Sequence, residues 1–431
     1  MTKIGKKSIM YDYISIRDYI CKSYGMRIAQ PGKSRVFTCC MEKIAGSQAL
    51  EMVLFMSDAQ QNRHDARTAH EPKLNRLFRA AIKNRASDLH LKVGQVPKLR
   101  MFGQLKNTMG DPINSEKMEE LVFEILTPHQ KEFFLKHGTL DFAHEVDGEH
   151  RFRTNLFRQR GMISLVARRV ESVIPPFETL HLPLVLEKIC DNRQGLILVV
   201  GPTGCGKTTT IASMINYINR TRHCHIITIE DPIEYLFKDE KAIVSQREIG
   251  IDTADYDEAL TYLMRQDPDV VFVGEARDAR TITAGMRAAE TGHLVFATLH
   301  SANAAQAVHR LLDLFPQSER DLVRQPLSLA MRAIVNQTLV PCLTEGIDRI
   351  PAVEILIVNA AARKLIAEGR EADLPAVIRT SQHEGMQDIT YDLVRLVKEG
   401  LIDPKDAYQY APNKDELRMV MKGITTTDGI L

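Results

Sequence analysis

The chain has 431 residues, enough for one to three domains with a substantial hydrophobic core. Hydrophobic residues make up 44% and charged residues 26%, and the formal net charge of +1 gives no overall reason to expect nucleic-acid binding. The seven cysteines form no C-x-x-C pair and no run approaches the ~18 apolar residues that span a membrane, so we expect a cytoplasmic protein without a zinc ribbon or transmembrane segment.

Residues 1–70 are predicted to be a basic, disordered N-terminal extension. Residues 1–50 hold nine lysines and arginines against three acidic residues, with tyrosines interleaved. This composition suits a basic arm for lipid or nucleic acid, and the alternative is an appended segment with no special role. A further hypothesis is that translation begins at Met56; a full-length intact mass of the native protein would contradict it.

Residues 71–170 follow the pattern of one α+β domain, which is a normal domain size. Apolar residues at helical spacing predict helices over 71–85, 115–126 and 128–137. Strand patterns cover 88–93, 97–105, 140–146, 150–157 and 163–170. Residues 171–182 contain Pro175-Pro176 and show no periodicity, so we expect a linker there.

Beyond the linker, residues 183–358 alternate between strands and helices, which predicts an α/β core. Short apolar runs without strict alternation are typical of parallel strands buried on both faces, and they cover 195–200, 225–229, 270–273 and 294–298. The helices between them are expected to begin near Lys207, Asp255, Asp278 and Ala304. Two more strands are predicted over 334–343 and 350–358, and residues 359–431 form a helical region.

Residues 201–208 match the phosphate-loop pattern G-x-x-x-x-G-K-[ST] between an apolar strand and a helix. Glycines let backbone N–H groups close around phosphate oxygens, and the helix N-terminus adds its positive end. We expect Lys207 to hold the β- and γ-phosphates of ATP and the Thr208 hydroxyl to bind Mg²⁺. The predicted nucleotide-binding residues are Gly201, Pro202, Thr203, Gly204, Cys205, Gly206, Lys207, Thr208 and Thr209.

Three later strand ends supply candidates for catalysis, because ligands in such sheets bind at the carboxyl ends of strands. Glu230 and Glu234 follow the strand 225–229, although an exposed acidic loop is the alternative. Glu275 follows Gly274, which stands where an acid usually ends such a strand, so Glu275 is expected to hold Mg²⁺ through a water. His293 and His300 flank the strand 294–298, and a packing or capping role is the alternative for each histidine.

Together these motifs resemble the secretion ATPase superfamily of type IV pilus and type II secretion motors, and its retraction ATPases PilT and PilU in particular. The resemblance spans residues 85–423 and includes an acidic box, an atypical Walker B segment and a histidine box. The segments that carry it are 86–91, 229–234, 265–278, 291–300 and 385–387.

The resemblance implies a PAS-like N-terminal domain, a RecA-like ATPase domain and a homohexamer that acts on an inner-membrane pilus platform protein. It implies that Glu234 activates the attacking water, that Glu275 orders Mg²⁺ and its waters, and that His300 senses the γ-phosphate. Glu230 and His293 belong to the same boxes and are expected near the nucleotide. Arginines of the first domain would clamp phosphates, and the candidates are Arg151, Arg153 and Arg168; an exposed arginine face is the alternative.

The subtype stays open at this point. Absence of a four-cysteine zinc module favours the retraction side, where the chain would power twitching motility from the cytoplasmic face of the inner membrane. The alternatives are a PilU-like accessory ATPase that works beside a paralogue, a related type II/IV assembly ATPase, and a RecA-like nucleic-acid translocase.

Overall fold

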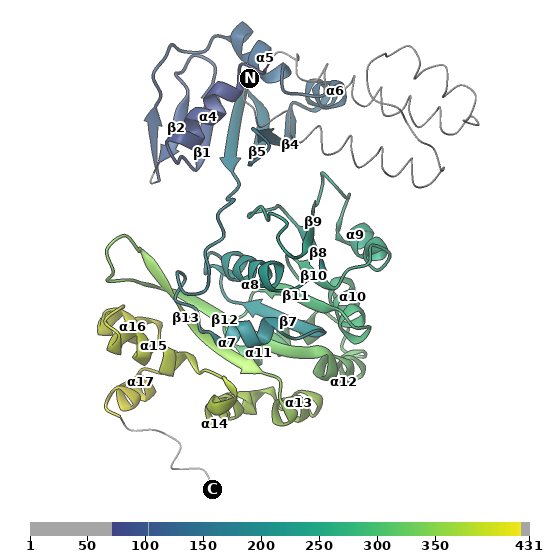
Figure 1. The fold of residues 1–431 in the computed structure, drawn as a ribbon, viewed down its shortest axis with the longest axis vertical. Helices are drawn as coiled ribbons and strands as arrows, with labels where there is room; N and C mark the ends of the chain where they lie inside the picture. The colour runs from purple at the N-terminus through teal and green to yellow at the C-terminus, as the bar shows by residue number, and fades with distance from the viewer. Residues whose placement is uncertain (1–70, 102, 424–431) are drawn as a thin grey trace, which may run out of the picture. The chain divides into compact units, whose positions relative to one another are not determined.

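The structure is a computed structural model that describes residues 71–101 and 103–423. The predicted N-terminal extension, residues 1–70, lies outside the described residues. Two β-sheets organise the described part of the chain, and both are drawn in Figure 1. The α/β fold class with a preceding α+β region is confirmed. The division into domains stays a prediction.

The first sheet has six antiparallel strands in the order β3-β2-β1-β6-β5-β4. The bounds are β1 Asp88–Lys92, β2 Lys98–Met101, β3 Gln104–Asn107, β4 Thr139–Val146, β5 His150–Gln159 and β6 Met162–Arg169. Residues 97–105 form a hairpin rather than the single predicted strand, because Gly103, at φ +76°, turns the chain.

Three helices pack their apolar faces against this sheet. They are α4 Asn75–Lys83, α5 Ser115–Phe123 and α6 Pro128–His137. Helix α6 has the predicted bounds because its end signals are strong. Thr127 and Gln130 form a capping box, Pro128 occupies the first turn, and Gly138 ends the helix in the left-handed conformation.

The second sheet has seven strands in the order β13-β12-β7-β11-β10-β8-β9. Only β13 is antiparallel to its neighbour. The bounds are β7 Gly195–Val200, β8 His225–Glu230, β9 Ile243–Glu248, β10 Val270–Val273, β11 Leu294–Leu299, β12 Met331–Pro341 and β13 Arg349–Ile357. Strand β9 was not predicted, because this edge strand is mostly polar and only partly buried.

Helices cover both faces of the second sheet, which explains the continuously apolar central strands. One face packs against α7 Val185–Cys190 and α8 Lys207–Thr221. The other packs against α9 Tyr256–Leu263, α10 Ala279–Glu290, α11 Ala304–Asp313 and α12 Arg320–Ala330. Strand β11, with all six residues buried, lies between two strands. One is β7, which leads into the phosphate loop, and the other is β10, which is followed by Glu275.

The described part of the C-terminal region, residues 359–423, is mainly helical. Its α-helices are α13 Ala360–Ala367, α14 Leu374–Thr380, α15 Ile389–Lys398, α16 Pro404–Tyr410 and α17 Lys414–Met421. Helices α13 and α14 extend the core under one face of the sheet. Helices α15, α16 and α17 form a separate cluster with the ends of β12 and β13.

The segment predicted as a linker, 171–182, is anchored to the second sheet and its helices. Phe177 and Leu182 are buried with α7 and α8, and Ser213 donates a hydrogen bond to the Pro175 carbonyl at 2.9 Å. Glu171 forms a bridge with Tyr235. Residues 171–182 are therefore irregular in structure, as their lack of hydrophobic periodicity predicts. Their isolated apolar residues nevertheless pack into the core of the second sheet.

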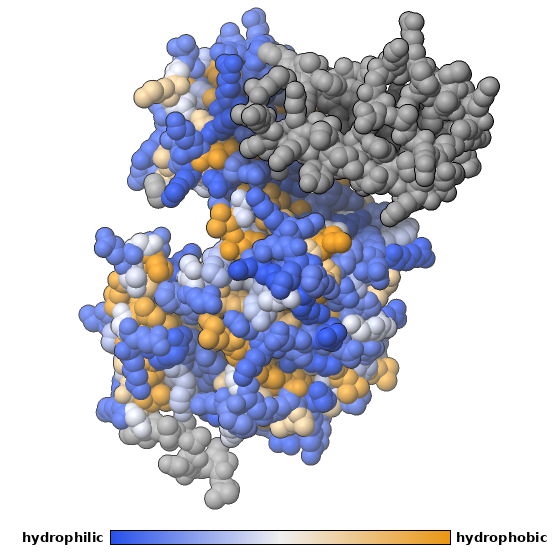
Figure 2. Space-filling view, viewed as in Figure 1, coloured by the Kyte–Doolittle hydropathy of each residue, from blue (hydrophilic) through white to orange (hydrophobic). Residues whose placement is uncertain are grey.

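Hydrophilic residues predominate on the face of the described part that Figure 2 shows, with apolar side chains scattered between them. Within residues 71–101 and 103–423, no helix combines the length and the apolar character that a membrane crossing requires.

We predict that Phe296→Ala lowers the free energy of unfolding by about 3–5 kcal/mol, because Phe296 is fully buried in β11 and truncation leaves a cavity. Denaturant unfolding of the purified protein measures this. Leu322→Ala is the control, since Leu322 is 76% exposed on α12 and its loss should change stability by less than about 0.5 kcal/mol. Equal effects of the two substitutions would contradict the packing described above.

Candidate functional site

The carboxyl ends of four parallel strands bring the candidate residues to one edge of the second sheet. Strand β7 leads into the phosphate loop, β11 into His300, β10 into Glu275 and β8 into the acidic segment 230–234. The pairings are in register, Val200 with Leu299 and Val273 with both Ala297 and Ile229. Segments up to a hundred residues apart in sequence therefore end side by side.

The phosphate loop needs its glycines for conformation and for space. Gly201, Gly204 and Gly206 have φ values of +146°, +76° and +89°, which L side chains rarely adopt. A Cβ on Gly201 would collide with the Gln337 carbonyl and lie 2.6 Å from the Cys205 sulfur. Helix α8 begins at Lys207, directly after this loop, so its first N–H groups and the loop face the same space.

Gln337 of β12 anchors the phosphate loop through two side-chain hydrogen bonds. Its amide donates a hydrogen bond to the Cys205 carbonyl at 2.7 Å, and its oxygen accepts one from the Thr210 hydroxyl at 2.7 Å. The side chain is only 3% exposed, so both bonds are protected from water. One buried carboxamide thus fixes the loop and the first turn of α8 relative to each other.

Lys207 lies across the mouth of the loop. Its ammonium donates to the carbonyls of Gly201 and Pro202 at 2.9 and 3.0 Å and lies 3.4 Å from His300 Nδ1. Burial lowers the pKa of Lys207, and the carboxylates of Glu275 and Glu234 oppose that shift. The cation therefore sits where phosphate oxygens would approach, with two acids nearby.

His300 and Glu275 form the next contact along the edge. His300 Nε2 lies 3.4 Å from Glu275 Oε1, and the other Glu275 oxygen accepts a hydrogen bond from Arg277 at 2.6 Å. Arg277 also reaches Asp231 at 3.4 Å. A continuous polar chain therefore runs from the phosphate loop to the acidic segment after β8.

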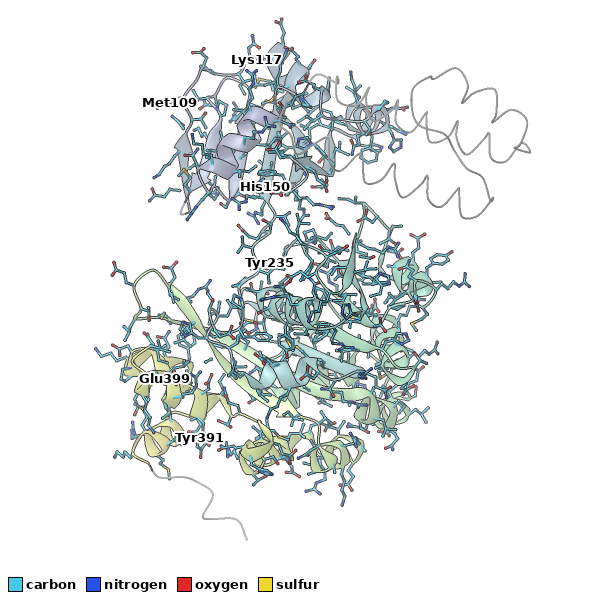
Figure 3. All side chains as sticks on the ribbon, viewed as in Figure 1. Met109, Lys117, His150, Tyr235, Tyr391 and Glu399 are labelled. Atoms are coloured by element: carbon cyan, nitrogen blue, oxygen red, sulfur yellow. The ribbon has the colours of Figure 1, made fainter. Side chains whose placement is uncertain are left out.

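Glu234 and Tyr235 approach the loop from the segment that follows β8. Glu234 is exposed, and its charge partly offsets the lowering of the Lys207 pKa that burial causes. Tyr235, labelled in Figure 3, shares a hydrogen bond of 2.9 Å with the hydroxyl of Thr209 in the first turn of α8. The predicted residue Thr209 is therefore engaged with Tyr235, and its neighbour Thr208 is half-buried.

Two predicted residues are not presented to the phosphate loop. Glu230 is 4% exposed, and its carboxylate accepts hydrogen bonds from Thr228 and from Gln246 of β9. Burial raises the pKa of Glu230 to about 7. His293 lies just before the amino end of β11, at the opposite edge of the sheet, where its ring contacts the Ala288 carbonyl at 2.9 Å.

The three candidate arginines share one face of the first sheet. Arg151 and Arg153 are two residues apart in β5, so their side chains share a face of the sheet. Arg153 lies directly opposite Arg168 of the neighbouring strand β6. Arg151 is already in an ion pair with the buried Glu248 at 3.0 Å, and Arg168 Nε donates to Asp88 at 2.9 Å. Arg153 and Arg168 are both exposed, but within the described residues Arg153 makes no ion pair.

Tyr256 is a site residue that sequence reasoning missed. A Cβ on Gly274 would lie 3.0 Å from the Tyr256 hydroxyl, so the tyrosine occupies space beneath the end of β10. Burial and the nearby Asp231 raise the pKa of Tyr256 to about 12, so the hydroxyl keeps its proton at physiological pH. No sequence motif marks this residue, because it begins a helix that contributes nothing else to the edge.

Gln337 and Arg277 were also missed. Gln337 carried a usable signal: Asn336-Gln337 is a pair of carboxamides inside a largely apolar, buried strand, and a buried amide must find partners. Arg277 lies within the Walker B segment but carried no separate signal, since arginines after strands are commonly solvated.

The residues present fit a nucleotide with a divalent cation. The loop forms a cradle that a Cβ would fill, the ammonium of Lys207 lies over it, and Thr208 and Glu275 offer hard oxygen ligands of the kind Mg²⁺ prefers. His300 and Lys207 both lie at the position expected for the terminal phosphate, beside the phosphate loop.

Comparisons with known proteins point to one family. The family model described as "Type II/IV secretion system protein" matches residues 180–399. The type IV pilus ATPase PilT of Pseudomonas aeruginosa is 39% identical over 338 residues, which cover 78% of this chain and 98% of that protein. The ATPase PilU of the same organism is 37% identical over 350 residues, covering 81% and 91%.

A solved structure agrees. The crystal structure of the pilus retraction motor PilT with bound ADP superposes with a TM-score of 0.73 at 41% identity, covering 81% of this chain and 99% of that one. Because both identity and coverage are high, the likeness extends over the two sheets as well as the phosphate loop.

We predict that Gln337→Leu weakens ADP binding about tenfold. The substitution keeps the approximate volume but leaves the Cys205 carbonyl and the Thr210 hydroxyl without a partner, which costs about 1–3 kcal/mol per group. Isothermal titration with ADP measures the affinity. Thr338→Ala, at the next residue of the strand, should leave it unchanged; equal losses in both variants would show that Gln337 does not support the loop specifically.

Proposed function

This chain belongs to the PilT and PilU family of type IV pilus ATPases, and we propose that it is a homohexameric motor that hydrolyses Mg-ATP to power pilus retraction and twitching motility. The observation that carries the proposal is the polar chain from Lys207 through His300 to Glu275 beside the glycine cradle. The relatives named as retraction and pilus ATPases align with most of this chain.

The chemistry follows from where each group lies. Glu234 is the carboxylate that would accept a proton from the attacking water, because it is exposed and close enough to Lys207 to affect its pKa. Lys207 and His300 would hold the oxygens of the terminal phosphate from two sides and stabilise charge as it develops. Backbone N–H groups of the loop would hold the remaining phosphates.

Thr208 and Glu275 would hold the magnesium ion, Thr208 directly and Glu275 through a bound water. When bound, the ion neutralises charge on the phosphate oxygens. Glu275 is kept in place by His300 on one oxygen and Arg277 on the other. Tyr256 and Gly274 support the strand end from which Glu275 projects.

We assign the arginine role to Arg153 first. It is exposed and has its neighbours Arg151 and Arg168 on the same face, whereas those two already bind Glu248 and Asp88. In a hexamer such a face would complete the site of a neighbouring subunit. The partners we propose are therefore other copies of this chain, an inner-membrane platform protein of the pilus and a paralogous retraction ATPase.

The main competing function is that of an accessory ATPase like PilU. The chain is 37% identical to PilU, nearly as similar as it is to PilT. A cell-level experiment separates the two. Deletion of the gene should leave surface pili present but unable to retract. If retraction persists and is only slower, the chain is an accessory subunit rather than the principal motor.

We predict that Glu275→Ala reduces steady-state Mg-ATP hydrolysis about 100- to 1000-fold, because preorganised electrostatic groups of this kind contribute that much to catalysis. Oligomer size is measured in the same samples. Asp257→Ala is the control, since Asp257 pairs with Arg280 on the exposed side of α9 and lies outside the site. A hexamer that binds ATP but is inactive even without substitution would overturn the motor proposal.

A further inference from the structure

The loop that follows His300 is held at three points. Arg310 of α11 donates to the His300 carbonyl, and Asn336 of β12 donates to the Ala302 carbonyl at 3.0 Å. Glu354 of β13 accepts a hydrogen bond from the Ala304 N–H at 2.7 Å. The position of His300 therefore depends on residues of the two strands β12 and β13, which lie on the far side of β7 from β11.

The orientation of the Asn336 amide is fixed by its partner. A backbone carbonyl can only accept, so the amide nitrogen must face Ala302 and the amide oxygen must point the other way. That oxygen is fully buried and has no hydrogen-bond partner among the described residues. Buried polar atoms are rarely left unpaired, so a donor is expected beside it.

Glu354 lies directly opposite Asn336 in the antiparallel pairing of β12 and β13. Directly opposed residues have Cβ atoms about 4.5–5.5 Å apart and their side chains on the same face. Both are almost fully buried, at 7% and 2% exposure. One Glu354 oxygen already accepts from Ala304, which leaves the second oxygen for the Asn336 side.

We propose that Glu354 is a positioning residue for His300: it carries a proton on its second oxygen and donates that proton to the unpaired oxygen of Asn336. The protonated carboxyl and the amide then form one unit that grips the loop 302–304 from both ends. The proposal rests on the function assigned to His300 above, and it concerns residues outside the motifs that carry the family resemblance.

The charge environment supports a protonated carboxyl. Burial raises the pKa of Glu354 to about 7, with Asp388 adding to the shift, while the Ala304 N–H and Arg379 oppose it. Arg379 of α14 is itself paired with Asp388, at the start of α15, and with Glu416 of α17. Arg379 therefore already forms ion pairs with two other acids, and it only partly offsets the rise in the Glu354 pKa.

Ionisation of Glu354 would remove its hydrogen bond to the Asn336 oxygen. A carboxylate has no proton to donate, so its oxygen would face the oxygen of Asn336 with like partial charge. Asn336 could then turn its amide nitrogen toward Glu354, which would remove the bond to the Ala302 carbonyl. The loop that carries His300 would lose one of its three supports as the pH rises through about 7.

The test compares Glu354→Gln with the wild-type hexamer. Glutamine supplies the same acceptor for Ala304 and a permanent donor for Asn336, and it cannot ionise. We expect kcat of the variant to match the wild type near pH 6, and the ratio of wild type to variant to fall about two- to tenfold as the pH rises to 8.5, with an apparent pKa near 7.

Two controls separate positioning from general damage. ADP affinity should not change in this series, because ADP lacks the phosphate that His300 contacts. Glu399→Gln changes the residue that directly follows α15, is labelled in Figure 3 and pairs with Arg395 at the surface; it should give a ratio that is independent of pH. A pH-independent ratio for Glu354→Gln, or a variant inactive at every pH, would overturn the proposal.

Infrared spectroscopy tests the proton without using activity. Burial also raises the pKa of Glu230 to about 7, so the Glu354→Gln spectrum is subtracted from the wild-type spectrum at each pH. At pH 6 this difference spectrum should show a protonated carboxyl band, and the band should disappear by pH 8.5. Absence of that band overturns the proposal even if the enzyme is active. If the band is present but neither protein hydrolyses ATP, the protonated pair stands and the assigned motor function fails instead.

Discussion

The site depends on hydrogen-bond partners for backbone carbonyls in two loops that leave the second sheet. The Cys205 carbonyl of the phosphate loop and the Ala302 carbonyl of the loop after His300 each accept a hydrogen bond from a side-chain amide of β12. The carboxamide pair Asn336-Gln337 in β12 serves both. Because successive side chains of a strand point to opposite faces, Gln337 reaches Cys205 on one face while Asn336 reaches Ala302 on the other.

This arrangement couples the two halves of the site mechanically. A displacement of β12 would shift the phosphate loop and the His300 loop together, since both are bound to adjacent residues of one strand. The parallel register of β7, β11, β10 and β8 then sets the remaining spacing along the edge. Lys207, His300, Glu275 and Arg277 stay in contact because their strands cannot slide without exposing apolar side chains.

Much of the fold could be predicted from the sequence because its signals are local. The phosphate loop, the capping box of α6 and the continuously apolar strands are each determined by residues near one another in the chain. The hairpin at Gly103 and the polar edge strand β9 were missed, since a short hairpin and a half-exposed strand lack a strong period. The isolated Phe177 likewise gave no sign that the irregular segment around it is buried.

In the candidate site, only residues that belong to a recognisable sequence motif could be predicted. Lys207 and Glu275 both contact His300, but Glu230 turns inward to Gln246 and His293 lies at the opposite edge of the sheet. A motif places a residue near a strand end without fixing which way its side chain points. Tyr256 and Glu354 contact segments far away in the sequence and no motif marks them, so only the folded chain identifies them. Gln337 differs, because the carboxamide pair that contains it is visible in the sequence of β12.

A single-turnover experiment with Glu234→Gln tests most directly whether this edge is a working ATP site. The substitution keeps the size of the side chain but removes the group assigned to accept the proton. We predict that the variant binds ATP with near wild-type affinity and retains it uncleaved, while the wild type converts it to ADP. Cleavage at the wild-type rate would show that Glu234 does not act as the base, and failure of both proteins to bind ATP would contradict the site itself.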